Sequence, residues 1–186
     1  LAEFLRELGV WEPAGLVNSW DEVLQINRCV PHFAAVHGNY LQPGAGSGIV
    51  RVICPRTRAA FGFSAGPLTE SRLALGTDGL SSNPDLDLLA EARFLRQEHP
   101  DTPGGLLLRA CTLGGAETLG FANEAGSLTA GKSADLVVIP LHEEEQADPH
   151  DLLLNSRHPV RAVLFRGRWI FDRADRLGPT EPTLPS

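Results

Sequence analysis

The sequence contains no methionine among its 186 residues. Because translation starts at methionine, we expect this sequence to be the back part of a longer protein. The first residues favour the same interpretation, since Leu1, Phe4, Leu5 and Leu8 already follow the spacing of an amphipathic helix.

Long apolar runs and basic clusters are also missing. No stretch approaches the ~18–20 apolar residues that a membrane-spanning helix needs, and the start lacks the basic and apolar regions of a signal peptide. The net charge is −7 at pH 7, and the basic residues form no run. This charge pattern argues against a nucleic-acid surface and does not favour binding to anionic membranes.

Cysteine is scarce, with only three residues in the chain. Cys29, Cys54 and Cys111 lie far apart, and their number is odd. This pattern fits neither a disulfide framework nor a Cys-x-x-Cys metal site. It predicts reduced, mostly buried thiols and a cytoplasmic location.

The most informative stretch that is present runs from Leu73 to Pro84. A short apolar run ends at Asp78, and a helix start follows, in which Asn83 is the expected cap and Pro84 the first helical residue. A carboxylate at the end of a buried strand, facing a helix N-terminus, is where α/β enzymes place their chemistry. The alternative is that Thr77-Asp78-Gly79 is an ordinary turn.

Hydrophobic periodicity and turn residues predict the remaining elements. The expected helices span residues 1–8, 20–28 (with a capping box at Ser19 and Glu22), 84–98, 104–119 and a short stretch near 149–155. The expected strands span 33–37, 49–54 (stopped by Pro55), 73–77 and 136–139, followed by a hairpin of 160–165 and 169–171.

This order of strands and helices predicts an α/β fold with parallel strands. The connection between the first two strands is unusual, because residues 41–48 are rich in glycine and cannot form a helix. A parallel crossover usually needs at least ~10–12 residues. Either this crossover is a bare loop, or the chain has lost a helix here.

Four motifs carry a resemblance to a known family. They are Ala35-Val-His-Gly-Asn-Tyr-Leu41, Val52-Ile-Cys-Pro-Arg-Thr57, Leu75-Gly-Thr-Asp-Gly-Leu-Ser-Ser-Asn83 and Gly126-Ser-Leu-Thr-Ala-Gly-Lys-Ser-Ala-Asp-Leu-Val137. Together they resemble the amidohydrolase superfamily, in its cytosine-deaminase-like and chlorohydrolase-like branch, which includes S-adenosylhomocysteine and guanine deaminases.

The resemblance implies a fold and a division of the chain. Residues 1–124 would be the C-terminal portion of a TIM (β/α)₈ barrel, containing strands six to eight. Residues 125–176 would supply strands of a small β-sandwich, and residues 177–186, which include three prolines, a disordered tail.

The resemblance also implies a chemistry, the hydrolytic deamination of a nitrogen heterocycle or nucleoside-like substrate. Asp78 would ligate a divalent metal, zinc in preference to iron, and act as general base on the attacking water. His37 would hydrogen-bond the attacking hydroxide or the developing oxyanion; its alternative is a histidine satisfied at a strand end. The metal is expected only in the full-length parent, which would be able to form a homo-oligomer.

Further residues at the expected strand ends are candidates for contact with a small-molecule substrate. They are Asn39, Arg56, Thr57, Ser81 and Asn83. A solvated loop is an equally good reading of Arg56 and Thr57. Ser81 and Asn83 also suit a role in shaping the loop and capping the helix.

The chain departs from the family pattern at several places. Its relatives carry histidines where this chain has Arg58 and Phe63, and the His-x-His pair of the first barrel strand is absent. Since tight metal binding usually needs three or four ligands, the isolated chain is predicted to be inactive. The alternative functions are a non-catalytic remnant or interaction module, and a different barrel hydrolase such as an imidazolonepropionase-like enzyme.

Overall fold

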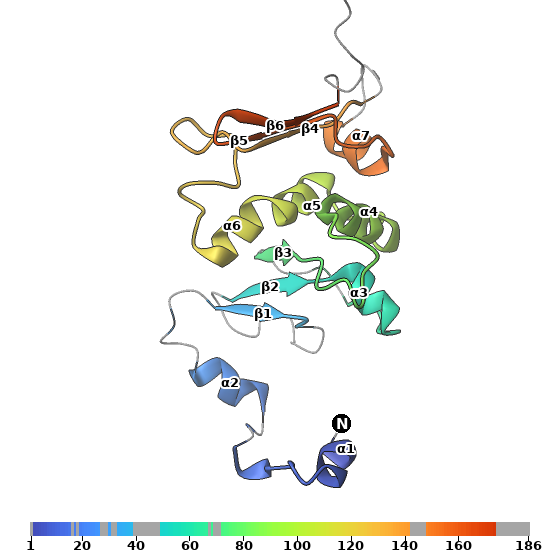
Figure 1. Cartoon of the computed structure of the whole chain (residues 1–186), viewed down its shortest axis with the longest axis vertical. Helices are drawn as coiled ribbons and strands as arrows, with labels where there is room; N and C mark the ends of the chain where they lie inside the picture. Colours follow the sequence, from blue (N-terminus) through green and yellow to red (C-terminus); the bar gives the residue numbers. More distant parts are fainter. Residues whose placement is uncertain are drawn as a thin grey trace, which may run out of the picture.

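The computed structural model describes residues 2–15, 17, 19–26, 30, 33–38, 49–66, 68, 72–141 and 148–173. The described residues form an α/β fold, as predicted, with two three-stranded sheets (Figure 1). The elements are α1 (Ala2–Glu7), the 3₁₀ turn η1 (Pro13–Gly15), α2 (Trp20–Ile26), β1 (Ala34–Val36), β2 (Val50–Ile53), α3 (Pro55–Ala60), β3 (Leu73–Leu75), α4 (Leu88–Glu98), α5 (Gly104–Cys111), α6 (Leu113–Leu119), β4 (Leu136–Val138), α7 (Pro149–Asn155), β5 (Ala162–Phe165) and β6 (Arg168–Asp172).

The first sheet contains β1, β2 and β3 in that order, and all its strands are parallel. Ala35 lies opposite Arg51, and Val52 opposite Ala74. All three residues of β3 are buried, which fits its unbroken apolar sequence. The predicted strands are therefore confirmed, although each is shorter than expected. The unusual crossover at 41–48 lies outside the described residues.

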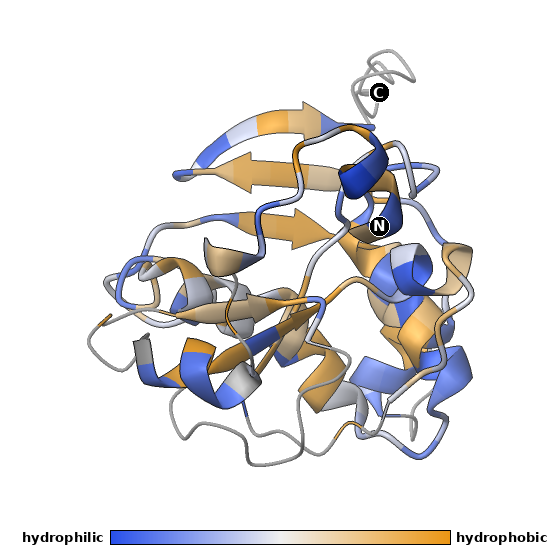
Figure 2. Cartoon of the chain, turned by 90° about the horizontal axis from the view of Figure 1, so that it is seen from below, coloured by the Kyte–Doolittle hydropathy of each residue, from blue (hydrophilic) through white to orange (hydrophobic). Residues whose placement is uncertain are grey.

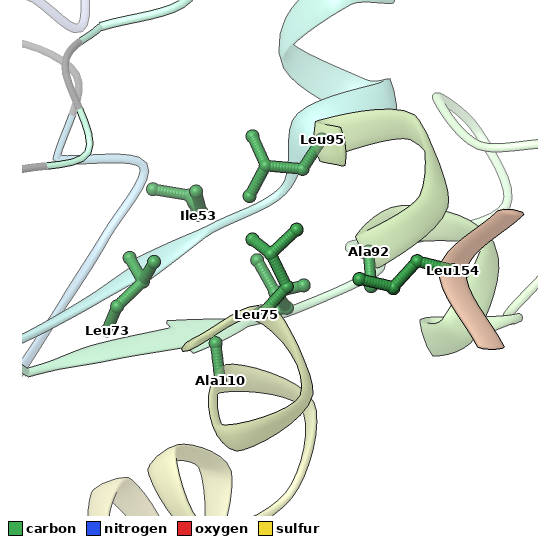
Figure 3. Packing of buried hydrophobic residues seen from close by; sticks show 8 residues of the cluster. Ile53, Leu73, Leu75, Ala92, Leu95, Ala110 and Leu154 are labelled. Atoms are coloured by element: carbon green, nitrogen blue, oxygen red, sulfur yellow. The ribbon is translucent and has the colours of Figure 1, made fainter. Parts of the chain in front are cut away.

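The helices α4, α5 and α6 lie between the two sheets, and all three contact β3 (Figure 1). Their inner faces form one hydrophobic core with the strands and α7 (Figure 3). The buried members of this core are Ile53, Leu73, Leu75, Ala92, Leu95, Leu107, Ala110 and Leu154. Burial of these side chains fixes β3 against the helix layer, and so fixes the loop that leaves β3.

The helix expected at 84–98 begins four residues later than predicted. Its N-cap is Asp87, whose side chain accepts a hydrogen bond from Ala90 N at 3.0 Å. Asn83, the predicted cap, is buried and bonds elsewhere, and Pro84 precedes the helix. The start is displaced because Asp85 Oδ1 accepts from Asp87 N, so the chain makes a turn before the helix.

Two further helix predictions need correction. The helix expected at 104–119 is two helices, α5 and α6, separated at Thr112, which has φ −123° and ψ −91°. The break lets α6 approach β3 so closely that a Cβ on Gly114 would lie 2.2 Å from Leu73 O. The helix α3 is not among the predicted elements, because the sequence pattern marks Pro55 only as the end of a strand, whereas proline also suits the first turn of a helix.

The second sheet contains β4, β5 and β6, and its strands are antiparallel. The predicted hairpin is confirmed, with Arg166 (φ 50°) and Gly167 (φ 75°) between β5 and β6. Positive φ at both loop residues matches the twist of a two-residue hairpin. Asp135 holds this turn by accepting from Arg166 N at 2.7 Å.

Other predicted elements of this region are also confirmed, since Pro149–Asn155 forms α7 and Gly126 and Gly131 turn with positive φ. Figure 2 shows hydrophobic residues gathered in the strands of both sheets. The tail predicted at 177–186 lies outside the described residues. Within the part of the chain that the structure describes, no helix is both long and apolar enough to cross a membrane.

Candidate functional site

His37 and Asp78 meet at the carboxyl ends of β1 and β3. His37 Nε2 lies 3.3 Å from Asp78 Oδ2, and the two side chains are 43% and 38% exposed. His37 N donates to Val52 O at 3.0 Å, which ties the end of β1 to β2. The pair is therefore both fixed by the sheet and open to a solute, which is what a reactive pair at strand ends requires.

Both residues of this pair have a left-handed backbone. His37 has φ 54° and Asp78 has φ 58°, values that residues other than glycine rarely adopt. Gly79 N donates to Asp78 Oδ1 at 2.8 Å, which stabilises the turn after Asp78. Strained residues of this kind cluster at functional sites, where the surrounding structure holds them. Two of them, in contact across a sheet, support the prediction of a site here.

The loop that carries Asp78 is held in place by side chains of α3 and of the turn before α4. Thr77 O accepts from Asn83 Nδ2 at 2.7 Å and from Thr57 Oγ1 at 3.3 Å. Thr57 Oγ1 also lies 3.1 Å from Ser82 Oγ. These bonds tie the strand end to α3 and to the turn before α4, so the position of Asp78 depends on both helices.

A buried glutamate, Glu91, lies at the base of this network. Its side chain is fully buried, and it accepts from Arg56 N at 2.9 Å, Arg56 Nε at 2.7 Å and Asn83 Nδ2 at 2.5 Å. Sequence reasoning missed Glu91. A signal was available, because Glu91 lies three residues after Leu88 and four before Leu95, on the face of α4 that the apolar spacing turns inward.

Arg56 also reaches the exposed carboxylate of Asp85. Its Nη2 lies 2.6 Å from Asp85 Oδ1, and its Nη1 lies 3.2 Å from Asp85 Oδ2. This bidentate contact is the main reason why the pKa of Asp85 is lowered from its ordinary value of 3.8. The same contact, with that to Glu91, raises the pKa of the Arg56 guanidinium, which therefore stays charged.

The lowered pKa of Asp85 predicts a pH dependence of stability. Its contribution should be fully present above the ordinary pKa and lost as the pH falls through the lowered value. Asp85→Asn should therefore be less stable than the native chain near neutral pH, and the difference should disappear in acid. Urea unfolding at several pH values measures this; a difference that persists unchanged below both pKa values would contradict the assignment. Because Asp85 is exposed, added salt should also weaken the effect.

Cys54 lies next to this network but is unsuited to attack a substrate. Burial, followed by the negative charges of Asp78 and Glu91, raises the pKa of its thiol to about 11. Burial likewise raises the pKa of Cys111 to about 12. Both thiols are free, and Cys54 is buried, as the sequence predicted.

The structure places the other predicted site residues at different depths. Arg56, Thr57 and Asn83 belong to the hydrogen-bond network that holds the Asp78 loop, whereas Ser81 is exposed in the turn that follows Asp78. Asn39 lies outside the described residues. The substrate contacts predicted for these five residues remain predictions.

Arg58, one of the two departures from the family pattern, has a structural role. It is buried, donates to Phe63 O at 2.6 Å and pairs with Glu98 of α4. Its guanidinium therefore fastens the end of α3 to α4.

The described residues do not complete a metal site. They contain no group of three or more histidine, cysteine, aspartate or glutamate side chains arranged to hold a metal ion. Asp78, the one predicted ligand, supplies a single carboxylate, whereas a catalytic zinc typically has three protein ligands. Any metal held by Asp78 would need ligands from elsewhere.

Comparison with known proteins gives consistent matches. Residues 61–170 match the model of the amidohydrolase family. The 5-methylthioadenosine/S-adenosylhomocysteine deaminase of Moorella thermoacetica is 30% identical over 139 residues, which are 66% of this chain and 32% of that protein. The chain thus spans about a third of the length of this relative.

Solved structures of deaminases are also similar to this chain. A zinc-bound adenosine deaminase from Xanthomonas campestris superposes with a TM-score of 0.65 at 30% identity, covering 75% of this chain and 37% of the other. The aminofutalosine deaminase of Helicobacter pylori superposes with a TM-score of 0.69, covering 91% of this chain and 46% of the other. At 21% identity, this second likeness shows the fold alone.

Proposed function

The chain belongs to the amidohydrolase family, and from this premise we propose that it is the part of a hydrolytic deaminase that carries the catalytic pair Asp78 and His37. The observation that carries the proposal is the 3.3 Å contact between these side chains at the ends of β1 and β3. The strained backbone of both residues supports it.

In this proposal, Asp78 is the general base. Its carboxylate accepts a proton from the attacking water and passes it to the leaving amine, a transfer that a positioned side chain typically accelerates about 10²–10⁴-fold. His37 donates a hydrogen bond to the negative charge that develops at the attacked carbon. Each has a solvent-open side chain from which to do so.

We propose that Asp78 is also one ligand of a divalent metal, zinc in preference to iron. The zinc-bound adenosine deaminase from Xanthomonas campestris, 30% identical to this chain, supports this choice. When bound, such an ion lowers the pKa of a coordinated water to about 7. Because the described residues do not complete its site, the remaining ligands would come from a longer polypeptide.

The proposed division of the chain follows the two sheets. The parallel strands β1, β2 and β3 would be strands six, seven and eight of a (β/α)₈ barrel within residues 1–124. The antiparallel strands β4, β5 and β6 would belong to a small sandwich within residues 125–176. The change from a parallel to an antiparallel sheet near this boundary supports the division.

The substrate class proposed is an amino-bearing nitrogen heterocycle or nucleoside-like molecule. Relatives named as 5-methylthioadenosine/S-adenosylhomocysteine deaminase support it. Arg56, Thr57, Ser81, Asn83 and Asn39 remain candidates for contact with it. Of these, Ser81 is exposed, whereas Arg56 and Asn83 already donate to Glu91.

The isolated 186-residue chain is expected to release no ammonia from aminopurines or aminopyrimidines, even with added Zn²⁺. The reason is that its described residues supply too few metal ligands. A coupled ammonia assay over a panel of these compounds makes the measurement. Steady turnover by the purified chain would contradict this expectation.

A chimera tests the activity itself. In the Moorella thermoacetica relative, the segment that corresponds to residues 33–173 of this chain is replaced by those residues, so that the chimera contains both His37 and Asp78. Ammonia release from 5′-methylthioadenosine and S-adenosylhomocysteine is then measured. The parent relative is the control. Activity in the chimera supports the proposed function. A folded chimera that binds zinc but releases no ammonia would favour a non-catalytic remnant, the alternative suggested by Arg58 and Phe63.

A further inference from the structure

Glu91 combines complete burial with a full set of hydrogen bonds. Its Oε2 accepts from Arg56 N, and its Oε1 accepts from both Arg56 Nε and Asn83 Nδ2. A buried carboxylate without such partners would be costly, so the three donors account for its presence in α4. They do not explain why the chain has a carboxylate here rather than an apolar residue.

The second partner of Asn83 supplies an explanation. Asn83 Nδ2 donates to Glu91 and also to Thr77 O, the carbonyl that directly precedes Asp78. Because both of these neighbours are acceptors, the amide nitrogen must face them. Glu91 therefore orients the side chain that holds the backbone of the catalytic loop.

The peptide unit between Thr77 and Asp78 is held at its carbonyl oxygen. Thr77 O accepts from both Asn83 Nδ2 and Thr57 Oγ1. Since a peptide unit is planar, these contacts fix its orientation and support the unusual φ of 58° at Asp78.

We propose that Glu91 is a positioning residue for Asp78, acting through Asn83 and the Thr77 carbonyl, which makes the inference rest on the proposed role of Asp78. Glu91 reaches Asp78 only through this chain of contacts. Without its charge, Asn83 loses its anchor, and the strained loop relaxes toward an ordinary backbone. The carboxylate of Asp78 then moves away from His37.

The chain contains a matched control for this role. Glu98 also lies on α4 and also pairs with an arginine of α3, in this case Arg58. Neither Glu98 nor Arg58 has a hydrogen bond to the loop of residues 77–83 among the contacts of the described residues. Loss of the Glu98 charge should therefore weaken the contact between α3 and α4 without freeing Asp78.

The experiment compares Glu91→Gln with Glu98→Gln in the 186-residue chain. NMR measures the hydrogen-exchange rate of the individual backbone amides in each variant. In Glu91→Gln, an NH2 group replaces one carboxylate oxygen. If it faces Arg56 Nε and Asn83 Nδ2, the bond to Asn83 is lost; if it faces Arg56 N, Asn83 keeps only a neutral acceptor in place of a charged one. Exchange at the amides of Asp78, Gly79 and Ser82 should rise by about ten- to a hundredfold, the factor expected for loss of one charge-assisted hydrogen bond. In Glu98→Gln, the same amides should change by less than about twofold relative to those in the β5–β6 hairpin.

A purely structural role predicts a different result. The slow amides of the whole chain would then accelerate together in both variants, and that result would overturn the proposal, as would unchanged exchange at residues 78–82 in Glu91→Gln. Should Glu91→Gln fail to fold, Glu91→Asp provides the test, because it keeps the charge but shortens its reach; its loop amides should also accelerate. Since exchange is measured without substrate, its outcome is separate from that of the chimera assay.

Discussion

Asp78→Asn is expected to lower kcat/KM for ammonia release by the chimera about a thousandfold or more. Asparagine has nearly the same size and can still accept the hydrogen bond from Gly79 N, but it cannot take a proton from water. A positioned general base contributes about 10²–10⁴-fold, and the loss of a metal ligand adds to this. Steady-state kinetics, with metal content measured alongside, gives the result.

The control is Asp101→Asn. Asp101 is exposed in the turn after α4, and its loss should leave kcat/KM within about twofold. Equal thermal unfolding midpoints for the two variants would show that the difference in kcat/KM does not come from a loss of stability. If the Asp78→Asn chimera kept more than a tenth of the kcat/KM of the unsubstituted chimera, the proposed role of Asp78 as general base would be wrong.

Gly114→Ala should be the most destabilising of the glycine-to-alanine changes in the described helices. A Cβ at this position would lie 2.2 Å from Leu73 O, and because that atom belongs to the backbone of β3, neither a rotamer change nor a small shift can relieve the clash. We expect a loss of about 3 kcal/mol in the free energy of unfolding, at the upper end of the usual cost of overpacking. Urea denaturation makes the measurement.

The neighbouring glycine provides the matched control. A Cβ on Gly115 would meet nothing within 4 Å, so Gly115→Ala should stabilise α6 by about 0.5–1 kcal/mol through the lower backbone entropy of the unfolded chain. If Gly114→Ala were as stable as Gly115→Ala, the close approach of α6 to β3 would be wrong.

The placement of His37 and Asp78 at one edge of the sheet could be predicted because local sequence marks both residues, whereas their catalytic role stays a proposal. His37 and Asp78 each follow a short apolar strand, and parallel strands bring their carboxyl ends to one edge of the sheet. The four motifs gave the family, and the match of residues 61–170 confirms it. The turns were also predictable from glycine, because glycine adopts positive φ without strain. Gly126, Gly131 and Gly167 all have positive φ in the structure.

The supporting network could not be predicted in the same way. Asn83 and Asp87 are both good helix caps, and the choice between them depends on Arg56, which comes from a distant part of the chain and reaches Asp85, Asp87 O and Glu91. Local patterns contain no information about such a partner. The break at Thr112 likewise depends on the distance between α6 and β3.

Glu91 was missed for a different reason. Its spacing on α4 places it on the buried face, but a glutamate in an apolar stripe is usually solvent-exposed at the edge of that stripe. Only the three donors from Arg56 and Asn83 make its complete burial possible. A charged residue at a core position of a helical pattern therefore indicates a buried network worth locating.

We propose that Asp78 and His37 act together as one catalytic unit. A double-mutant cycle in the chimera tests this proposal, with kcat/KM measured for Asp78→Asn, His37→Gln and the double variant. Residues that act as a unit give strongly non-additive effects. We predict that the double variant will be no more than a few-fold slower than Asp78→Asn alone; a loss equal to the product of the two single losses would contradict the claim.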